Sequence, residues 1–254
     1  MPELPEAEVV AVQLRTRLLG AVLKDCWIGR PDIVRQGLPA VDWYRGACLT
    51  AIERWGKSIV LTFARGQELR YLVAELGMTG LLLFHVPQAS YHKHMHVILT
   101  FEGGREEHLR YWNPRRFGRI YLLDPLELDG FLARRFGHDP LKMTWDQFRG
   151  LVRGRRGRVK ALLMHQQRIA GIGNIYATEI LFGARVHPHR IGNRLRQQTI
   201  RRLYDTMRSI LMGAVAEGGS SVRDFLAPNG ARGQYQRRHQ VYNKAGQPCP
   251  AGCG

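Results

Sequence analysis

The letters MPELPE open the chain, and the second residue of this run can act as a nucleophile. Removal of the initiator methionine, which is usual before a small second residue, exposes Pro2 as a secondary amine. A proline nitrogen can attack an aldehyde-like carbon and form an iminium, the covalent chemistry otherwise assigned to lysine. Because an α-amine titrates well below a lysine side chain, more of it is unprotonated at neutral pH. Glu3 and Glu6 lie beside it as candidate proton donors.

The residues that follow predict a helix that would carry this amine at its positive end. Pro5 suits the first position of a helix, and an apolar face continues towards Gly20 through Val9, Val10, Val12, Leu14 and Leu18. The positive end of a helix lowers the pKa of a nearby amine further. The alternative is a capped first helix whose start has no chemical role, and residues 1–20 alone do not decide between the two.

The composition of the chain indicates a globular protein with a polyanionic partner. The chain has 254 residues, 44% of them hydrophobic, which suffices for one large domain or two smaller ones. Its net charge of +17 is uneven: residues 1–150 carry 20 Lys and Arg against 17 Asp and Glu, and residues 151–254 carry 18 against 4. The excess in the second part favours binding to nucleic acid. The sequence has no run of about 18 apolar residues and no basic-then-apolar leader, so we expect a cytoplasmic protein without membrane insertion.

The pattern of predicted elements changes along the chain. Up to about residue 125, short β-branched or aromatic runs predict strands at residues 57–63, 69–76, 94–101, 108–112 and 117–123, and their spacing suggests an antiparallel sandwich or barrel. From about residue 145, an apolar stripe with helical spacing predicts helices, the last of which stops at Gly218 and Gly219. Residues 137–140, between the two patterns, are a candidate hinge. The tail from Asn229 is predicted to form a loop followed by a β-hairpin.

A glycine-containing turn in the helical part is a candidate phosphate site. Residues 167–177 predict a helix end, a turn and a new helix capped by Asn174, whose first N–H groups are unpaired. Arg155, Lys160 and three further arginines lie just upstream, so a nucleic-acid backbone fits this segment better than a nucleotide. On its own the turn is weak evidence, because helical hairpins also use glycine for packing.

Two loops carry side chains of the kind that enter a DNA duplex. Arg115, Arg116 and Phe117 place two cations and a ring between strands, so the ring could wedge between bases while an arginine replaces a displaced base. Met78, in a glycine-flanked turn, is a second apolar candidate. Each of these residues taken singly is more often a loop residue without function.

Four cysteines are too few for a disulfide framework in a chain of this size. Cys26 and Cys48 lie among apolar residues and are interpreted as packing residues. Cys249 and Cys253 match half of a zinc site, which needs four ligands. Nearby His239 is a further candidate ligand, although a lone histidine is more often a surface residue.

Together these segments resemble the bacterial formamidopyrimidine-DNA glycosylases, of the family that also contains endonuclease VIII. The resemblance covers nearly the whole chain: PELPE at the start, Lys57 within RWGKSIVL, LGMTG at 76–80, HKHMH at 92–96, NPRRFG at 113–118, IAGIGNIYATEILF at 169–182, GGSSVRDFL at 218–226 and QVYNKAGQPC at 240–249. The opening run and the GIGNIYA segment are highly specific in combination.

The resemblance implies an α+β fold and a DNA repair activity. Residues 1–135 would form an N-terminal catalytic β-sandwich with flanking helices, and residues 136–148 a linker. Residues 149–228 would form a helix-two-turns-helix DNA-binding domain, and residues 229–254 a loop and an incomplete zinc-finger hairpin. The implied activity is that of a monomeric DNA glycosylase and abasic-site lyase of base excision repair, which removes oxidised purines from damaged double-stranded DNA held between the domains.

The same resemblance assigns roles to individual residues. Pro2 would be the Schiff-base nucleophile, Glu3 the acid and base at the opened sugar, and Lys57 a further proton donor in strand cleavage. The positions that hold DNA match His94, Arg115, Arg155 and Asn174. The trio that fills the space left by an everted base matches Met78, Arg115 and Phe117.

The sequence departs from the family pattern at three places. The second cysteine pair is missing, and Cys249 and Cys253 are separated by three residues instead of two, so the expected structural zinc ion is in doubt. Asn113 replaces the usual aspartate before Arg115, and Met95 interrupts the histidine motif. We expect neither substitution to abolish activity.

Two alternatives to an oxidised-purine glycosylase remain. An endonuclease VIII-like enzyme would act on oxidised pyrimidines, but Leu4 and the long loop at residues 224–235 resemble the purine-acting branch. A non-catalytic DNA-binding protein would need none of Pro2, Glu3 and Lys57, all of which are present.

Overall fold

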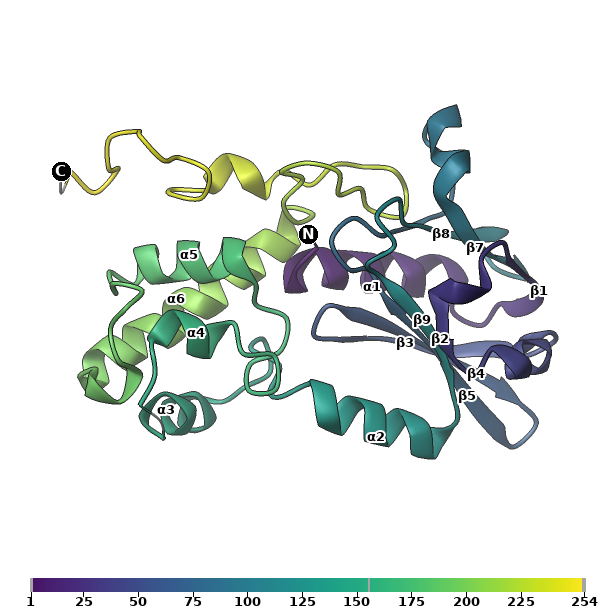
Figure 1. The fold of residues 1–254 in the computed structure, drawn as a ribbon, viewed down its shortest axis with the longest axis horizontal. Helices are drawn as coiled ribbons and strands as arrows, with labels where there is room; N and C mark the ends of the chain where they lie inside the picture. Colours follow the sequence, from purple (N-terminus) through teal and green to yellow (C-terminus); the bar gives the residue numbers. More distant parts are fainter. Residues whose placement is uncertain (1, 155, 253–254) are drawn as a thin grey trace.

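The computed structural model describes residues 2–154 and 156–252, which form a β-rich part and a helical part. Figure 1 shows the two parts side by side, with the N-terminus between them. The α-helices are α1 (Leu4–Leu18), α2 (Pro125–Arg135), α3 (Trp145–Arg153), α4 (Val159–Leu163), α5 (Asn174–Gly183) and α6 (Gln197–Ala216). The strands are β1 (Val22–Ile28), β2 (Val34–Gln36), β3 (Cys48–Trp55), β4 (Ser58–Arg65), β5 (Glu68–Glu75), β6 (Leu81–Leu83), β7 (Met95–Glu102), β8 (His108–Trp112) and β9 (Arg119–Leu123).

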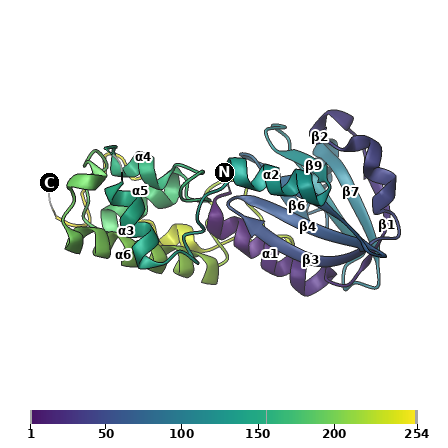
Figure 2. The same ribbon diagram turned by 90° about the horizontal axis from the view of Figure 1, so that it is seen from below.

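The strands form a β-sandwich, as predicted. They follow the order β2-β9-β5-β4-β3-β1-β7-β8-β6, and β1 joins β3 through the residue pair Val22 and Cys48. The sheet folds over at this joint, so that Phe63 on β4 stacks on Phe101 on β7 with ring centroids 6.4 Å apart. Figure 2 shows the strands from below, with α1 and α2 flanking them. Apolar side chains of both halves of the sheet and of α1 share one core.

Helix α1 brings the N-terminal residues to the junction of the two parts. Apolar residues at every fourth position are buried against the sandwich, namely Val10, Leu14 and Leu18. Val12, which we predicted on the same face, is 43% exposed, because a two-residue step turns a helix by about 200°. The helix begins at Leu4, one residue before the predicted start, and Glu3 is its N-cap.

The five strands predicted from the sequence correspond to β4, β5, β7, β8 and β9, each within two residues of its expected bounds. The sequence did not locate β1, β2, β3 and β6 individually. β2 and β6 have three residues each, and the pairing of β3 with β4 shifts between Leu49 and Ala51. Short or irregular strands give little periodic signal, which explains why they were missed.

The helical part has a core of its own. Helices α3 to α6 bury their apolar faces against one another, with Phe148, Tyr176 and Leu203 among the fully buried side chains. The predicted stripe lies on α6, which ends before Gly218. Among the described residues, no helix is long and apolar enough to cross a membrane.

The segment that we predicted as a hinge is held from both sides. The Arg54 guanidinium on β3 donates to the Asp139 carboxylate at 2.5 Å and to the Glu8 carboxylate at 2.7 Å. On the other side, the amide of His138 donates to the carbonyl of Arg168 at 2.9 Å. This linker is therefore tied to the sandwich and to the helical part at once.

The predicted C-terminal hairpin is wrong, since residues 229–252 contain no strand. They form a 3-10 turn at Tyr235–Arg238 and a series of turns that runs along the top of the helical part in Figure 1. The backbone amides of Gln240, Val241 and Tyr242 all donate to the Glu179 carboxylate on α5, at 2.8, 3.1 and 2.8 Å. Donors used in this way are not available to a β-ladder.

Candidate active site

The Glu3 carboxylate closes the N-terminal end of α5. It accepts hydrogen bonds from the backbone amides of Gly173, Ile175 and Tyr176 at 2.7, 2.9 and 3.3 Å. We predicted Asn174 as the cap of this helix, which is wrong: Asn174 is the first helical residue, and the capping oxygen comes from another part of the chain. The first amides of a helix are unpaired and carry partial positive charge, so they suit a carboxylate.

Gly173 leaves just enough room for this contact. A Cβ atom at position 173 would overlap the Glu3 carboxylate and would lie 2.8 Å from the Lys57 ammonium. The same observation places the Glu3 carboxylate and the Lys57 ammonium on one side of the Gly173 backbone. The glycine-rich turn, which we predicted as a phosphate site, here receives an internal carboxylate.

Burial shifts the pKa values of Glu3 and Lys57, and the charge of each residue opposes that shift in the other. Burial raises the pKa of Glu3, and the positive charge of Lys57 opposes that rise. Burial also lowers the pKa of Lys57, and the negative charges of Glu3 and Glu6 oppose that fall. The pKa of Glu3 is thus raised and that of Lys57 is lowered, and these are the directions that suit a pair exchanging protons with a substrate.

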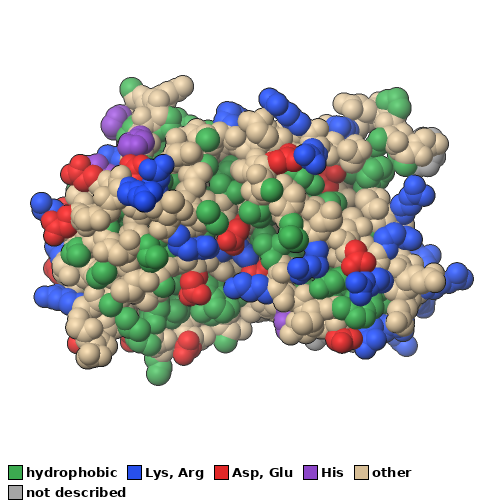
Figure 3. All heavy atoms as spheres, turned by 180° about the vertical axis from the view of Figure 1, so that it is seen from behind, with side chains coloured by type: hydrophobic (Ala, Val, Ile, Leu, Met, Phe, Trp, Pro, Cys, Tyr) green, Lys and Arg blue, Asp and Glu red, His purple; other side chains and the backbone are tan. Residues whose placement is uncertain are grey.

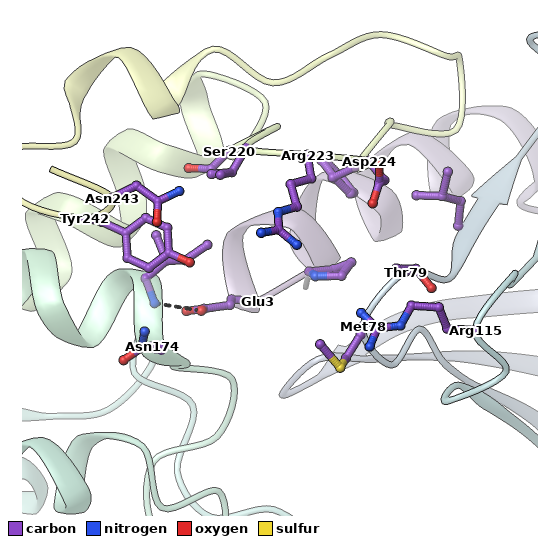
Figure 4. A pocket seen from close by; sticks show the side chains of 15 residues that line it. Glu3, Met78, Thr79, Arg115, Asn174, Ser220, Arg223, Asp224, Tyr242 and Asn243 are labelled. Carbon is purple, nitrogen blue, oxygen red and sulfur yellow. Dashed lines mark hydrogen bonds between the residues drawn. The ribbon is translucent and has the colours of Figure 1, made fainter. Parts of the chain in front are cut away.

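A cavity of about 280 Å³ lies at the N-terminal end of α1, between the two parts. Figure 4 shows Glu3 and Asn174 on one side of it, Met78, Thr79 and Arg115 on the other, and Ser220, Arg223 and Asp224 along a third side. The lining residues are Pro2, Glu3, Met78, Thr79, Leu81, Arg115, Asn174, Ile175, Ser220, Val222, Arg223, Asp224, Phe225, Tyr242 and Asn243. Among the described residues, the buried Thr79 hydroxyl has no hydrogen-bond partner, so it is available to a bound molecule.

The two predicted wedge loops lie against each other. A Cβ atom on Gly77 would come within 2.7 Å of the Phe117 backbone, so the turn that carries Met78 packs on the loop that carries Phe117. The Arg115 guanidinium lies 5.1 Å from the centre of the Phe117 ring. Met78 and Phe117 are 41% and 54% exposed. Met78 and Arg115 line the cavity, whereas Phe117 lies outside its lining.

The predicted DNA-contacting residues are dispersed. Asn174 and Arg115 reach the cavity. His94 ends the 3-10 segment Ala89–His94 and lies edge-on to Trp112, with ring centroids 6.3 Å apart. Lys160, on α4, donates to the Thr178 hydroxyl at 3.1 Å and lines a different groove. Arg155 lies outside the described residues.

The described residues do not form a zinc site. Cys253 lies outside them, and within 2–154 and 156–252 no three His, Cys, Asp or Glu side chains are grouped as metal ligands. His239 has another partner: its Nε2 atom hydrogen-bonds the Ser220 hydroxyl at 3.0 Å, and its ring is buried. The zinc expectation therefore has no support in this part of the chain.

Sequence reasoning missed the role of several residues around the cavity. Glu6, which we had placed beside the amine as a proton donor, instead accepts the Glu3 amide at 2.8 Å and the Tyr176 hydroxyl at 2.6 Å. Tyr242 and Asn243 reach the cavity from the C-terminal segment. These residues are far apart in sequence, and no local pattern signals that they meet. The available signals were two runs: GGSSVRDFL, four of whose members line the cavity after Ser220, and QVYNKAGQPC, which contains Tyr242 and Asn243.

Comparisons with known proteins agree with this architecture. Residues 1–120 match the family model of the formamidopyrimidine-DNA glycosylase N-terminal domain, and residues 136–226 match that of the formamidopyrimidine-DNA glycosylase H2TH domain. Curated relatives named formamidopyrimidine-DNA glycosylase include those of Thermomicrobium roseum, 39% identical over 100% of this chain and 92% of the relative, and Solibacter usitatus, 37% identical over 98% and 90%.

Solved structures lead to the same family. The MutM (Fpg) protein of Thermus thermophilus superposes with a TM-score of 0.84 at 35% identity, covering 98% of this chain and 90% of that protein. The Lactococcus lactis Fpg in complex with abasic-site DNA superposes with a TM-score of 0.85 at 31% identity, covering 99% and 92%. With both family models and full-length relatives in agreement, the chain belongs to the formamidopyrimidine-DNA glycosylase family.

Proposed function

We propose that the protein is a DNA glycosylase and abasic-site lyase that removes oxidised purines, including 8-oxoguanine and formamidopyrimidines, from duplex DNA. Its relatives carry the glycosylase name, and the related structures include complexes with DNA containing an abasic site, Fapy-dG or 8-oxo-G. Such a substrate supports a cytoplasmic location in a bacterium. The activity would begin with eversion of the damaged nucleotide, because its glycosidic carbon is inaccessible within the stack.

The observation that carries this proposal is the arrangement of Pro2, Glu3 and Lys57. Pro2 borders the cavity, the Glu3 carboxylate is fixed by three amides, and the Lys57 ammonium lies beside Glu3. Once the initiator methionine is removed, the Pro2 nitrogen is a nucleophile next to an acid and base. A DNA-binding protein without catalysis would have no use for a partly buried Lys57 beside a buried Glu3 at this point.

The chemistry follows from these groups. The neutral Pro2 nitrogen forms a bond to the sugar C1′, and the damaged base leaves as an anion with the bonding electron pair and takes up a proton from water. Glu3 takes the proton from the alkylated Pro2 nitrogen and returns one to the ring oxygen as the C1′–O4′ bond breaks, which leaves an iminium. The iminium makes the C2′–H bond acidic, and loss of that proton expels the 3′ phosphate. Lys57 serves as a further proton donor in this elimination.

The other cavity residues would hold the DNA. Met78 and Arg115, with Phe117 beside them, fill the space that the everted base leaves, and Asn174 binds the backbone next to the reacting sugar. The loop that begins at Ser220 encloses the base. On the face shown in Figure 3, Lys and Arg side chains gather over the helical part, at the right of the view. Their contacts with phosphates make affinity fall steeply with salt.

The second candidate function is removal of oxidised pyrimidines by the same chemistry. The loop from Ser220 to Phe225 on the cavity wall favours the purine assignment, since it forms an enclosure for the base. Both activities share Pro2, so they differ only in which lesion is everted and held.

Borohydride trapping on duplexes with defined lesions tests the proposal. We expect a covalent adduct with 8-oxoguanine and formamidopyrimidine duplexes and weaker trapping with an oxidised pyrimidine. Pro2→Gly, or an N-terminal extension that survives processing, should abolish the adduct while duplex binding persists. Undiminished trapping with a blocked N-terminus would contradict the role of Pro2 and point to Lys57 instead.

A further inference from the structure

Four buried polar side chains form a continuous hydrogen-bonded chain beside the cavity. The Tyr176 hydroxyl on α5 lies 2.6 Å from Glu6 Oε1 on α1 and 3.1 Å from the Ser220 hydroxyl. The Ser220 hydroxyl lies 3.0 Å from His239 Nε2 in the C-terminal segment. None of the four residues is more than 4% exposed. The chain thus connects segments that span almost the whole sequence.

One end of this chain holds the backbone next to the nucleophile. Glu6 Oε2 accepts the amide of Glu3 at 2.8 Å, and Glu6 Oε1 also accepts the amide of Ser220 at 2.6 Å. Glu3 directly follows Pro2, so the Glu6 carboxylate fixes the position of the amine. A protonated Glu6 would accept these hydrogen bonds more weakly, because hydrogen bonds to a charged acceptor are about twice as strong.

The direction of the donors decides whether Glu6 stays charged. With a proton on His239 Nε2, this N–H donates to the Ser220 oxygen, the Ser220 hydroxyl donates to Tyr176, and the Tyr176 hydroxyl donates to Glu6. Every donor then points towards the carboxylate. In the opposite direction, Glu6 must carry the proton and His239 Nε2 must be bare.

The surroundings of His239 favour a neutral ring that carries one proton. Burial lowers the pKa of His239, the nearby Lys244 acts in the same sense, and the Glu179 carboxylate on α5 opposes them. The rings of Tyr235 and Tyr242 pack at 6.0 and 5.8 Å from the imidazole and fix its plane. The imidazole is therefore oriented with one nitrogen towards Ser220.

We propose that His239 is a positioning residue which, through Ser220 and Tyr176, keeps Glu6 ionised and thereby holds Pro2 in its reactive position. This inference rests on the proposed covalent role of Pro2 and extends it to a residue of the C-terminal segment. His239 does not touch the substrate; it acts through the chain.

The pH dependence of the covalent step reports this coupling. Burial raises the pKa of Glu6, whereas the hydrogen bonds from Tyr176 and from the amides of Ser220 and Glu3 oppose the rise. The charged groups that face Glu6 are Glu3 and Lys57. Removing the Tyr176 hydroxyl takes away a donor to the carboxylate, so Glu6 gains its proton at higher pH. The acid limb of the pH profile should move up.

The experiment measures single-turnover cleavage of an abasic-site duplex against pH. Tyr176→Phe should move the acid limb up by about one pH unit, so that the rate on that limb falls about tenfold. His239→Leu should move it in the same direction by a smaller amount, and His239→Gln, whose amide can donate to Ser220, should restore most of the rate. Duplex affinity should not change.

The double variant Tyr176→Phe/His239→Leu shows whether the two residues act through one hydrogen-bonded chain or independently. Tyr176→Phe and His239→Leu act on the same carboxylate through the same links, so their combined shift should be close to that of Tyr176→Phe alone. Tyr235→Phe is the matched control: its ring packs against both residues, and its hydroxyl makes no hydrogen bond to another described residue. Additive shifts, or an equal shift in Tyr235→Phe, would overturn the proposal.

A measurement without DNA tests the hydrogen-bonded chain of side chains independently of the activity. Nitrogen NMR of the imidazole should find the proton of His239 on Nε2, and Tyr176→Phe should move it towards Nδ1, because the Ser220 hydroxyl then donates to Nε2. A bare Nε2 in the wild type would refute the donor direction. If the wild type forms no borohydride adduct, the proposed function fails, while this spectrum still decides whether the chain exists.

Discussion

The amide of Gly173 donates to the Glu3 carboxylate at 2.7 Å, across 170 residues of sequence. This contact joins the first turn of α1 to the first turn of α5, so the position of the proposed acid and base depends on the docking of the two parts. The amides at the start of α5 stabilise the negative charge of Glu3, and burial opposes it. The active site is therefore complete only when the β-rich part and the helical part are docked.

A methyl group at position 173 should disrupt the contact between Gly173 and the Glu3 carboxylate. In Gly173→Ala, the added Cβ overlaps the Glu3 carboxylate and lies 2.8 Å from the Lys57 ammonium, so both groups must move. A displacement of about 1 Å at a reacting group can lower a rate by about 100-fold. We expect borohydride trapping to fall by about this factor while duplex affinity changes little. Gly150→Ala is the control, since nothing lies within 4 Å of its Cβ, and it should leave trapping unchanged.

The charge of Lys57 should set the pH at which Glu3 is active. Lys57→Met removes the positive charge that opposes the effect of burial, so the raised pKa of Glu3 should rise further. The acid limb of borohydride trapping should then move up by about one pH unit. Lys57→Arg keeps the charge and should leave the limb near its wild-type position. An unchanged limb in Lys57→Met would show that Glu3 does not titrate against Lys57.

The sequence predicted only those site residues whose role is signalled by a short run of neighbouring residues. Pro2, Glu3 and Lys57 were predicted as site residues because each stands in a specific run, and the strands with β-branched or aromatic runs were located within two residues of their bounds. The cap of α5 was misassigned to Asn174, because the real cap, Glu3, lies in the other part of the molecule. Long-range pairing of this kind leaves no periodic pattern in the sequence.

The predicted hairpin failed for a related reason. Composition and turn residues favoured a hairpin after Asn229, but strand formation depends on which partners the amides find. In the structure, three consecutive amides that begin at Gln240 bind Glu179. Glu179 lies on α5 between Thr178 and the apolar residues Ile180–Phe182, and its sequence context gave no sign of this role. A buried carboxylate can thus override a local preference for strand.

The linker contact of Arg54 should contribute to stability. Its side chain is 3% exposed and pairs with Glu8 and Asp139, so Arg54→Met leaves the partly buried Asp139 carboxylate without a counter-charge and leaves Glu8 with Arg15 alone. Breaking a buried pair in this way costs about 3 kcal/mol. Urea unfolding at neutral pH should report a loss of this size. A loss no larger than that of an exposed pair, such as Arg30→Met beside Asp32, would contradict the role of the linker contact.

The contact between Arg54 and Glu8 should also make the free energy of unfolding depend on pH in the acid range. Burial raises the pKa of Glu8, but the hydrogen bond and charge of Arg54, with those of Arg15, outweigh it and hold the pKa of Glu8 below its usual value. Because the folded pKa lies below the unfolded one, this contribution is complete above the unfolded pKa and is lost as the pH falls through the folded pKa. Wild-type stability should therefore fall over that acid range, and the fall should be smaller in Arg54→Met. Equal slopes in the two proteins would exclude Glu8 as the titrating group.

Phe117 should matter for eversion and not for bond breaking. The ring is 54% exposed, lies outside the cavity lining and packs against the turn that carries Met78, so it is placed to enter a duplex without reaching the sugar. An everted base loses a few kcal/mol of stacking and pairing, and an inserted ring recovers part of that loss only while the base is out. Phe117→Ala should therefore slow excision of a paired lesion more than it weakens binding. The same variant should cut a preformed abasic site nearly as fast as the wild type, since no base remains to be extruded.

Leu126→Ala, which truncates a 76% exposed side chain on α2, is the control and should change neither rate. The decisive quantity is the ratio of the two rates in each protein: an equal slowing of both substrates by Phe117→Ala would show that the ring supports the loop and does not act as a wedge.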